Sequence, residues 1–199
     1  IAQAGLVTGG TGSLVRPVVS CKGTTCQYGL YDTFALSEKI HERFYLGYHT
    51  VKLPHKFKIA CGGCPNNCVK PDINDLGIIG QLVPNVDTDS CNGCKKCQVA
   101  VACPMKAVSV EDGEIEINEE VCNNCGRCVG TCPFDVIEEG TPGFKITIGG
   151  RWGKKVNRGQ ALNKIFTTEE ELLDTVEKAI LFFREQGKTG ERFADTIER

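Results

Sequence analysis

The sequence predicts an α+β fold in which a compact cysteine-rich unit interrupts a mixed α/β host domain. Thirteen cysteines fall into two zones, five within the first 70 residues and eight between Cys91 and Cys132. The composition changes abruptly at the second zone, whereas the apolar residues on either side of it follow strand and helix periods. We therefore expect a discontinuous host domain over residues 1–82 and 139–199, with an inserted domain over residues 83–138.

Charge and hydropathy exclude several classes of protein. The 23 Lys and Arg against 25 Asp and Glu give a net charge of -2, and nothing in this balance predicts a nucleic-acid or membrane-surface partner. The longest strongly apolar stretch, residues 179–183, is far shorter than the ~20 residues of a spanning helix, so we expect no membrane partner. No export signal is visible after Ile1. Many thiols without such a signal predict a cytoplasmic protein with metal-bound thiolates rather than a disulfide scaffold.

The host domain begins with a glycine-rich stretch and a strand. Gly9, Gly10 and Gly12 lack the dinucleotide-binding spacing and a P-loop lysine, and therefore predict a loop rather than a nucleotide site. The apolar residues Val18 and Val19 predict a strand that leads into the first cysteine.

A helix is predicted next. Asp32 can cap a helix that runs to about Leu46, because apolar residues recur every four positions at Leu36, Ile40 and Phe44.

Two extended segments follow. Residues 51–60 predict an extended segment, with Lys52, Lys56 and Lys58 on alternate positions. These lysines form either the solvated face of a strand or a contact with an acidic cofactor. Residues 76–83 predict a further strand.

The C-terminal part of the host predicts one strand and one helix. Alternating apolar residues over 144–148 predict a strand that ends at Gly149 and Gly150. Thr167 or Thr168, with a glutamate three residues later, predicts a capping box, and Gly187 ends the helix. Its apolar face consists of Leu172, Leu173, Val176, Ile180 and Phe183.

The eight cysteines of the insert form two copies of one motif. The second copy starts at Cys122 and reads C-x2-C-x2-C-x3-C-P, the pattern of two-cluster bacterial ferredoxins. The first copy starts at Cys91 and reads C-x2-C-x2-C-x5-C-P, which indicates an internal duplication. In such pairs the fourth cysteine binds the other cluster, so two 4Fe-4S clusters with crossed ligands are predicted. The predicted sets are Cys91, Cys94, Cys97 and Cys132, and Cys103, Cys122, Cys125 and Cys128.

The segment between the copies predicts a hairpin, and the copies themselves leave zinc as a competing metal. Val108 and Val110 can face Ile115 and Ile117 across an Asp-Gly turn, which sets the copies back to back. Zinc competes with iron because repeated Cys-x2-Cys pairs also suit a tetrahedral site. The third equally spaced cysteine and the Cys-Pro of each copy favour clusters.

The remaining cysteines supply a third candidate site. Cys21-x4-Cys26 and Cys64-x3-Cys68 provide four thiolates, the number that a third cubane requires. Cys61 is the expected spare, although Cys61-x2-Cys64 is itself a metal-like spacing and leaves the alternative open.

The residues around these cysteines resemble a known family. VVSCKGTTC at residues 18–26 and GGCPNNC at residues 62–68 resemble the cluster-binding region of siroheme sulfite and nitrite reductases. That family has Cys-x5-Cys in the first segment, so Cys21 and Cys26 are one residue closer than its pattern. The resemblance covers most of the chain outside the insert. With the inserted unit, the chain is similar to small anaerobic and dissimilatory-type sulfite reductases.

The resemblance implies a sulfite-reductase-like host domain, three 4Fe-4S clusters and siroheme. Cys68 would bridge one cluster iron to the siroheme iron. Siroheme carries many carboxylates, so basic donors and closely approaching glycine backbone are expected around it, although each basic residue alone can equally be a surface residue. The expected contacts are Arg16, Lys70, Gly149, Gly150 and Arg151.

The implied reaction is the six-electron reduction of sulfite to sulfide or of nitrite to ammonia, with sulfite favoured. The implied partners are an electron donor (a ferredoxin, flavin or deazaflavin protein) and an N-terminal half or partner subunit that completes the siroheme pocket. Because the chain starts at Ile1 without Met, we expect the C-terminal part of a larger reductase, which alone need not be active. The alternatives are an electron-transfer protein that has lost siroheme and a structural cluster protein.

Overall fold

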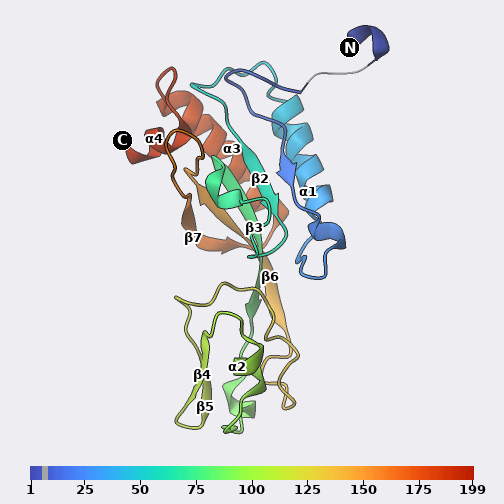
Figure 1. The fold of residues 1–199 in the computed structure, drawn as a ribbon, viewed down its shortest axis with the longest axis vertical. Helices are drawn as coiled ribbons and strands as arrows, with labels where there is room; N and C mark the ends of the chain where they lie inside the picture. The colour runs from blue at the N-terminus through green and yellow to red at the C-terminus, as the bar shows by residue number, and fades with distance from the viewer. Residues whose placement is uncertain (6–8) are drawn as a thin grey trace. The chain divides into compact units, whose positions relative to one another are not determined.

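The computed structural model of the protein describes residues 1–5 and 9–199 and divides into two compact units (Figure 1). The first unit comprises Ile1–Ile79 and Phe144–Arg199, and the second comprises Gly80–Gly143. The strands are β1 (Val19–Ser20), β2 (Ile59–Gly62), β3 (Leu76–Pro84), β4 (Val108–Glu111), β5 (Glu114–Ile117), β6 (Gly140–Ile148) and β7 (Gln160–Phe166). The helices are α1 (Thr33–Ile40), α2 (Gln98–Ala102), α3 (Glu169–Gln186) and α4 (Phe193–Glu198).

A mixed five-stranded sheet of order β1-β2-β3-β6-β7 organises the first unit. The strands β1, β2 and β3 are parallel, whereas β6 and β7 form an antiparallel pair. The predictions of a strand before the first cysteine, of a strand over residues 76–83 and of a strand ending at Gly149 are confirmed. The mixed α/β character expected of the host is confirmed as well.

The first helix follows its predicted cap. The side chain of Asp32 accepts hydrogen bonds from the backbone N–H groups of Phe34 and Ala35, as an N-cap residue does. After Ile40 the chain continues as a π-helical turn, His41–Leu46, in which the N–H of Gly47 donates to the carbonyl five residues back. The expected end near residue 46 is therefore confirmed, with a change of helix type on the way.

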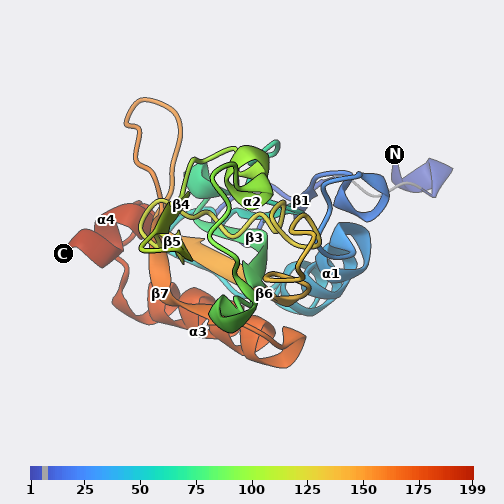
Figure 2. The same cartoon turned by 90° about the horizontal axis from the view of Figure 1, so that it is seen from below.

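Helix α3 lies next to α1 on the same side of the strands (Figure 2). The Thr168 hydroxyl accepts from the N–H of Glu171 at the start of α3, and Gly187 ends it, as predicted. Lys39 pairs with Glu169, and Arg43 pairs with Glu177. The residues of α3 that are fully buried, each stabilising the fold by about 1.5–3 kcal/mol, are Leu172, Val176, Ile180 and Phe183.

Three features of the first unit differ from the prediction or lie outside it, and a fourth agrees with it. The extended segment over residues 51–60 is only partly a strand, because the chain bends around Pro54 and regular pairing begins at Ile59. The strand β7 and the helix α4 were not predicted. The glycine-rich stretch from Gly9 to Gly12 is a loop, as predicted.

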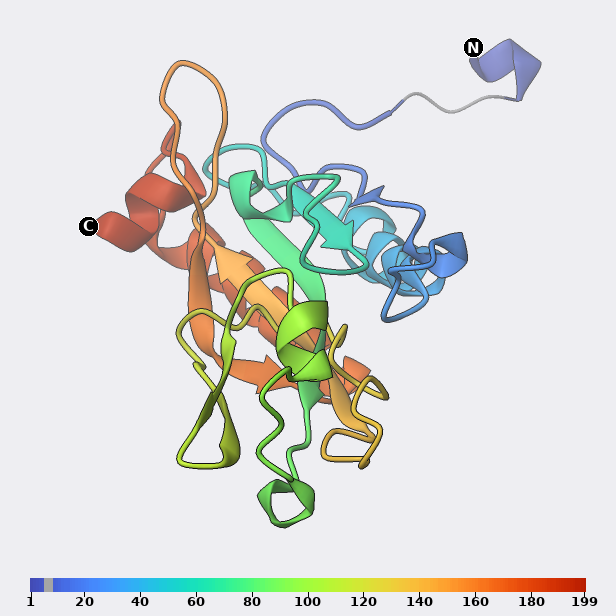
Figure 3. The same ribbon diagram turned by 60° about the horizontal axis from the view of Figure 1, so that its bottom comes forward.

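The second unit contains a hairpin and a short helix. The strands β4 and β5 pair so that Val108 is opposite Ile117 and Val110 is opposite Ile115, which confirms the predicted hairpin. Figure 3 shows α2 beside this hairpin. A small core gathers Val99 of α2 with residues of the hairpin and of the second cysteine run, and several cysteines pack against it. No helix in the described ranges, 1–5 and 9–199, is long and apolar enough to cross a membrane.

Candidate functional site

The two cysteine pairs of the first unit follow neighbouring parallel strands. Ser20 of β1 is in register with Cys61 of β2, and the N–H of Cys21 donates to the carbonyl of Cys61 at 3.0 Å. Because parallel strands end at the same edge of a sheet, the loops that follow β1 and β2 leave the sheet side by side. These loops carry the first pair of cysteines and the second pair.

The two loops approach each other closely. The N–H of Gly63 donates to Sγ of Cys21 at 3.1 Å, and the N–H of Leu30 donates to the carbonyl of Gly63 at 2.9 Å. A Cβ atom on Gly63 would lie 2.9 Å from Cα of Gly23, so only glycine allows this approach. An N–H directed at a thiolate sulfur stabilises the charged form that binds iron.

Thr33 also holds the first loop, and the sequence did not reveal it. Its side chain is fully buried, and its hydroxyl donates to the carbonyl of Cys21 at 2.8 Å. The N–H of Thr24 donates to the same hydroxyl oxygen at 3.2 Å. The only sequence signal was its place directly after the capping Asp32. Thr33 therefore connects the cysteine loop to the start of α1.

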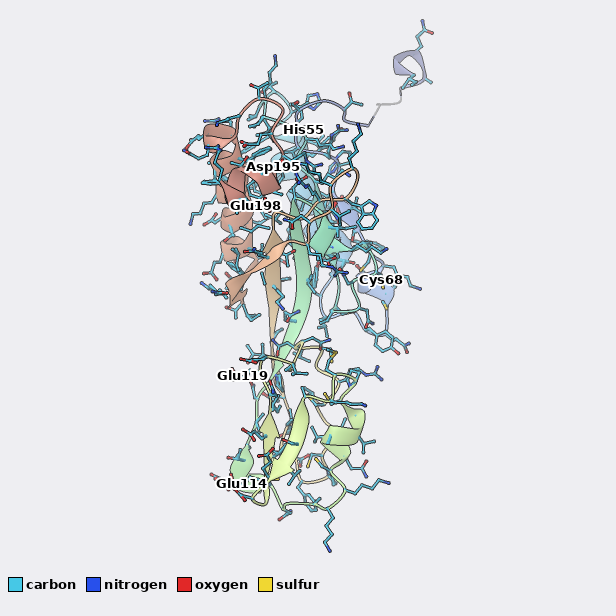
Figure 4. The ribbon with its side chains drawn as sticks, turned by 60° about the vertical axis from the view of Figure 1, so that its left-hand side comes forward. His55, Cys68, Glu114, Glu119, Asp195 and Glu198 are labelled. Carbon is cyan, nitrogen blue, oxygen red and sulfur yellow. The ribbon has the colours of Figure 1, made fainter. Side chains whose placement is uncertain are left out.

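The four thiols of this site lie within electrostatic range of one another. Burial raises the pKa of the Cys64 thiol, and negative charge on Cys68, Cys21 and Cys26 raises it further. The pKa of Cys64 therefore depends on the charges of all three other cysteines of the predicted set. Cys68 is exposed, unlike its three partners, and Figure 4 shows it at the edge of the unit. The arrangement leaves one thiol of the set directed outward.

Cys61 has a different environment from these four. It is fully buried in β2 within the main hydrophobic cluster. Burial raises the pKa of its thiol to about 12, negative charge on Cys21 also raises it, and the Tyr31 hydroxyl acts in the opposite direction. A thiol in apolar surroundings is inert. This placement supports the assignment of Cys61 as the spare cysteine.

The second unit gathers each crossed set of cysteines at its own cavity. One cavity of about 240 Å³ is lined by Cys91, Cys94 and Cys97 of the first copy together with Cys132 of the second. A narrower cavity of about 20 Å³ is lined by Cys103 of the first copy and by three cysteines of the second, namely Cys122, Cys125 and Cys128. These two groups are the sets that the duplicated motif predicted.

Electrostatics and backbone geometry describe the narrower cavity further. Burial raises the pKa of the Cys128 thiol, and negative charge on Cys122, Cys125 and Cys103 raises it further. The N–H of Ala107 donates to Sγ of Cys103 at 3.3 Å. The turn of the second copy depends on left-handed backbone on both sides of Cys125, with φ of 53° at Asn124 and 69° at Gly126.

The geometry bears on the choice between zinc and clusters. Four thiolates on one zinc lie about 3.8 Å apart, because each Zn–S bond is about 2.3 Å long and the site is tetrahedral. Among the residues that the structure describes, no three His, Cys, Asp or Glu side chains are close enough to share one metal ion. Four thiolates on a cubane lie further apart, because each binds a different iron atom.

Most of the residues expected to contact siroheme have partners within the protein. The Arg16 guanidinium donates to the carbonyls of Gly10 and Gly12, which ties down the glycine-rich loop. Arg151 pairs with Asp195 at 2.7 Å.

Other residues of the protein also fill the space beside the Gly149–Gly150 turn. Gly149 has a φ of 81°, and a Cβ atom on Gly150 would lie 2.4 Å from the carbonyl oxygen of Asn74. These glycines serve the close packing of the β6 end. Lys70, by contrast, is exposed two residues after Cys68.

A group of basic residues surrounds one buried carboxylate. Asp75 is fully buried, accepts from the N–H of Lys58 at 2.9 Å and pairs with Arg192 at 2.8 Å. Burial lowers the pKa of Lys56, and the charges of Lys58, Arg192 and Arg16 lower it further. Positive charge therefore exceeds negative charge here.

The pKa of His55 is also lowered, first by burial and then by the charges of Arg192 and Lys56. Of the lysines on alternate positions in the sequence, Lys56 and Lys58 thus belong to one charged group. The sequence did not predict its arginines as members, because they are distant along the chain.

Comparison with known proteins assigns the family. The chain matches the family described as nitrite and sulphite reductase 4Fe-4S domain over residues 11–199. The chain belongs to this family. It is 33% identical over 193 residues to the coenzyme F420-dependent sulfite reductase of Methanocaldococcus jannaschii. It is 31% identical over 176 residues to one subunit of the anaerobic sulfite reductase of Salmonella typhimurium.

The crystal structure of dissimilatory sulfite reductase I shares the fold, with a TM-score of 0.68, 25% identity and coverage of 96% of this chain and 51% of that chain. The match to the Methanocaldococcus jannaschii protein covers 96% of this chain but only 29% of that protein. The match to the Salmonella typhimurium subunit covers 85% of this chain and 50% of that subunit. The resemblance seen in the cysteine motifs is confirmed for the 4Fe-4S domain. The activity of a whole reductase is a proposal for this chain.

Proposed function

We propose that this chain is the cluster-bearing part of a siroheme-containing sulfite reductase and carries electrons to siroheme. The observation that carries the proposal is the site at the ends of β1 and β2, in a chain of the 4Fe-4S domain family. Four cysteines meet there, three of them half-buried and Cys68 exposed. Sulfite is favoured over nitrite because both curated relatives described above are named as sulfite reductases.

Three clusters belong to this proposal. Residues 83–138 form an inserted ferredoxin domain, and the two cavities lined by its cysteines support a cubane at each crossed set. The third cubane is held by Cys21, Cys26, Cys64 and Cys68 in the host domain. In that host site, Gly63 donates its N–H to one of the ligating sulfurs. The inserted domain receives single electrons and the host cluster delivers them.

Siroheme, when bound, supplies the iron on which the anion is reduced. Among the residues of this chain, Cys68 presents a thiolate outward that can be shared between cluster and siroheme. Lys70, exposed close behind it, offers a cation for a carboxylate. Arg16 and Arg151 act mainly by holding the surrounding loops in place, because their guanidinium groups already have partners in the protein.

The basic group around Asp75 supports a role for a further half or subunit. It lies before β2, whereas the cysteines follow it, so a strand about 13 Å long separates the two features. We propose that the lysines of this group, Lys56 and Lys58, bind an anionic group, a siroheme carboxylate or sulfite. In one chain these basic residues lie at the opposite end of β2 from the cysteines. An N-terminal half or partner subunit is therefore needed to bring a basic group next to a cysteine site and complete a siroheme pocket.

The first test is the cluster content of the complete gene product, prepared anaerobically. We expect about 12 iron atoms and about 12 acid-labile sulfides per chain, the content of three cubanes. About 8 of each would remove the host cluster from the proposal. Absence of extractable siroheme would leave only the alternative of an electron-transfer protein without haem.

Gly29→Ala tests the host cluster separately. A Cβ atom on Gly29 would lie 1.8 Å from the carbonyl oxygen of Gly23, so the loop that carries Cys26 must move. We expect the iron content to fall to about 8 per chain, with the remaining iron reporting an intact inserted domain. Gly9→Ala is the matched control, since no atom of the described residues lies within 4 Å of its Cβ position. Unchanged iron in Gly29→Ala would contradict the proposed ligand loop.

A further inference from the structure

The second unit carries a dense acidic ridge along its hairpin and the turn that follows β5. We define the ridge as the exposed carboxylates of residues 111–120, which are Glu111, Asp112, Glu114, Glu116, Glu119 and Glu120. Figure 4 labels Glu114 and Glu119 along one side of this unit. Within the described parts of the chain, none of the six forms an ion pair. Six like charges over ten residues repel each other unless an external cation offsets them.

The opposite face of the same hairpin lines a predicted cluster site. Side chains alternate along a strand, so Val110 and Ile115 point away from the ridge. Both line the cavity of Cys91, Cys94, Cys97 and Cys132. The strand residues of the ridge, Glu111, Glu114 and Glu116, therefore lie on the face of the hairpin opposite this cavity.

The rim of this cavity is open to solvent. Cys94 is exposed, and Phe134, which also lines the cavity, is 45% exposed. An exposed thiol and an exposed aromatic ring at the rim give an incoming electron carrier a short route to a cluster held there. This is an observation independent of the ridge, and it points to a redox partner.

The charge is also divided unevenly along the chain. Gly80–Gly143 contains 11 acidic and 4 basic residues, a net charge of -7. The remaining residues contain 14 acidic and 19 basic residues, a net charge of +5. The near-neutral total thus conceals a strongly acidic unit, and the partner that fits this unit has a basic surface.

We propose that the ridge is the docking surface for the electron donor, a one-electron carrier protein whose redox group is surrounded by basic residues. The inference rests on the proposed function, since it requires a cluster at Cys91, Cys94, Cys97 and Cys132. In each encounter the donor loses one electron and this cluster gains it, and no covalent bond changes. Electrons enter the chain at this cluster, which one layer of the hairpin separates from a donor bound on the ridge.

The test measures electron exchange with probes of opposite charge. The complete gene product is reduced, freed of reductant and mixed in a stopped-flow instrument with cytochrome c, which is basic, or with hexacyanoferrate(III), which is anionic. The variant is Glu114→Gln/Glu116→Gln/Glu119→Gln/Glu120→Gln. At low salt we expect it to reduce cytochrome c about tenfold more slowly than the wild type, with a weaker salt dependence. Its reaction with hexacyanoferrate(III) is expected to become faster, which damage to a cluster would not produce.

A matched control separates the ridge from net charge. The variant Glu38→Gln/Glu42→Gln/Glu170→Gln/Glu185→Gln removes four exposed carboxylates from the first unit and has the same total charge. We expect its rate with cytochrome c to stay within about twofold of the wild type. Equal rates in the two variants would contradict the proposed docking surface but not the proposed clusters. A wild-type protein without iron and acid-labile sulfide would overturn the proposed function as well.

Discussion

Cys68→Ser is expected to abolish sulfite reduction by the complete gene product, with a loss of more than about 100-fold. Its thiol is the exposed member of the host set, and a serine oxygen is a poor replacement for the soft sulfur ligand of iron. Spectroscopic coupling between siroheme and cluster should disappear with the turnover. Electron transfer through the inserted domain, measured as reduction of an added dye, should remain.

The control for this experiment is Cys61→Ala. Cys61 is fully buried in β2 and belongs to the hydrophobic cluster, so its loss is expected to affect packing and not turnover per bound siroheme. Wild-type turnover in Cys68→Ser would refute the bridging role. If Cys61→Ala loses turnover and iron while Cys68→Ser keeps both, Cys61 and not Cys68 is the cluster ligand.

Arg192→Ala is expected to destabilise the first unit by about 3–5 kcal/mol. Its guanidinium pairs at 2.8 Å with Asp75, whose side chain has no exposed surface. Removal of the arginine leaves a buried carboxylate that keeps the backbone N–H of Lys58 and the charges of Lys58 and Lys56 but has lost its paired guanidinium. The free energy of unfolding, measured anaerobically by denaturant titration, should show the loss.

The surface pair between Arg158 and Asp72 provides the matched comparison. It has the same kind of partners, but the Arg158 side chain is 79% exposed. Solvent screens such a pair, so Arg158→Ala is expected to cost about 1 kcal/mol or less. Equal losses in the two variants would contradict a special role for the buried pair.

The loss in Arg192→Ala should also depend on pH. Burial raises the pKa of Asp75, and Arg192 opposes that rise, so the variant raises this pKa further. A carboxyl whose pKa is higher in the folded than in the unfolded chain loses stabilising free energy as pH rises from the unfolded value through the folded one. The deficit of the variant should therefore be smaller at about pH 5 than at about pH 8. A deficit that grows on acidification would contradict this assignment.

Local signals in the sequence were sufficient to predict the helix starts and the hairpin, which are stabilised by neighbouring residues. Asp32 and Thr168 start their helices because a side-chain oxygen satisfies N–H groups within three residues. The hairpin between β4 and β5 follows from alternating apolar residues around Asp112 and Gly113, both of which have positive φ. Such features need no distant partner.

Elements that depend on distant partners were missed. In β7, Phe166 is the only buried residue, so the strand shows no clear alternation and forms because it pairs with β6. Helix α4 has six residues, too few for a periodic signal, and is held by the burial of Phe193. The segment around Pro54 was predicted to be extended over too long a range, since lysines on alternate positions do not by themselves make a strand.

The sequence by itself determined the family motif, the helix caps and the hairpin, because these depend on spacing along the chain. Only the tertiary structure decided which residues remain available for a ligand. It engages Arg16 and Arg151 with partners in the protein, buries Cys61 and leaves Cys68 exposed. These outcomes depend on contacts between segments as distant as Asp75 and Arg192, which are 117 residues apart. No local pattern can specify such a contact, because burial and pairing are properties of the packed chain.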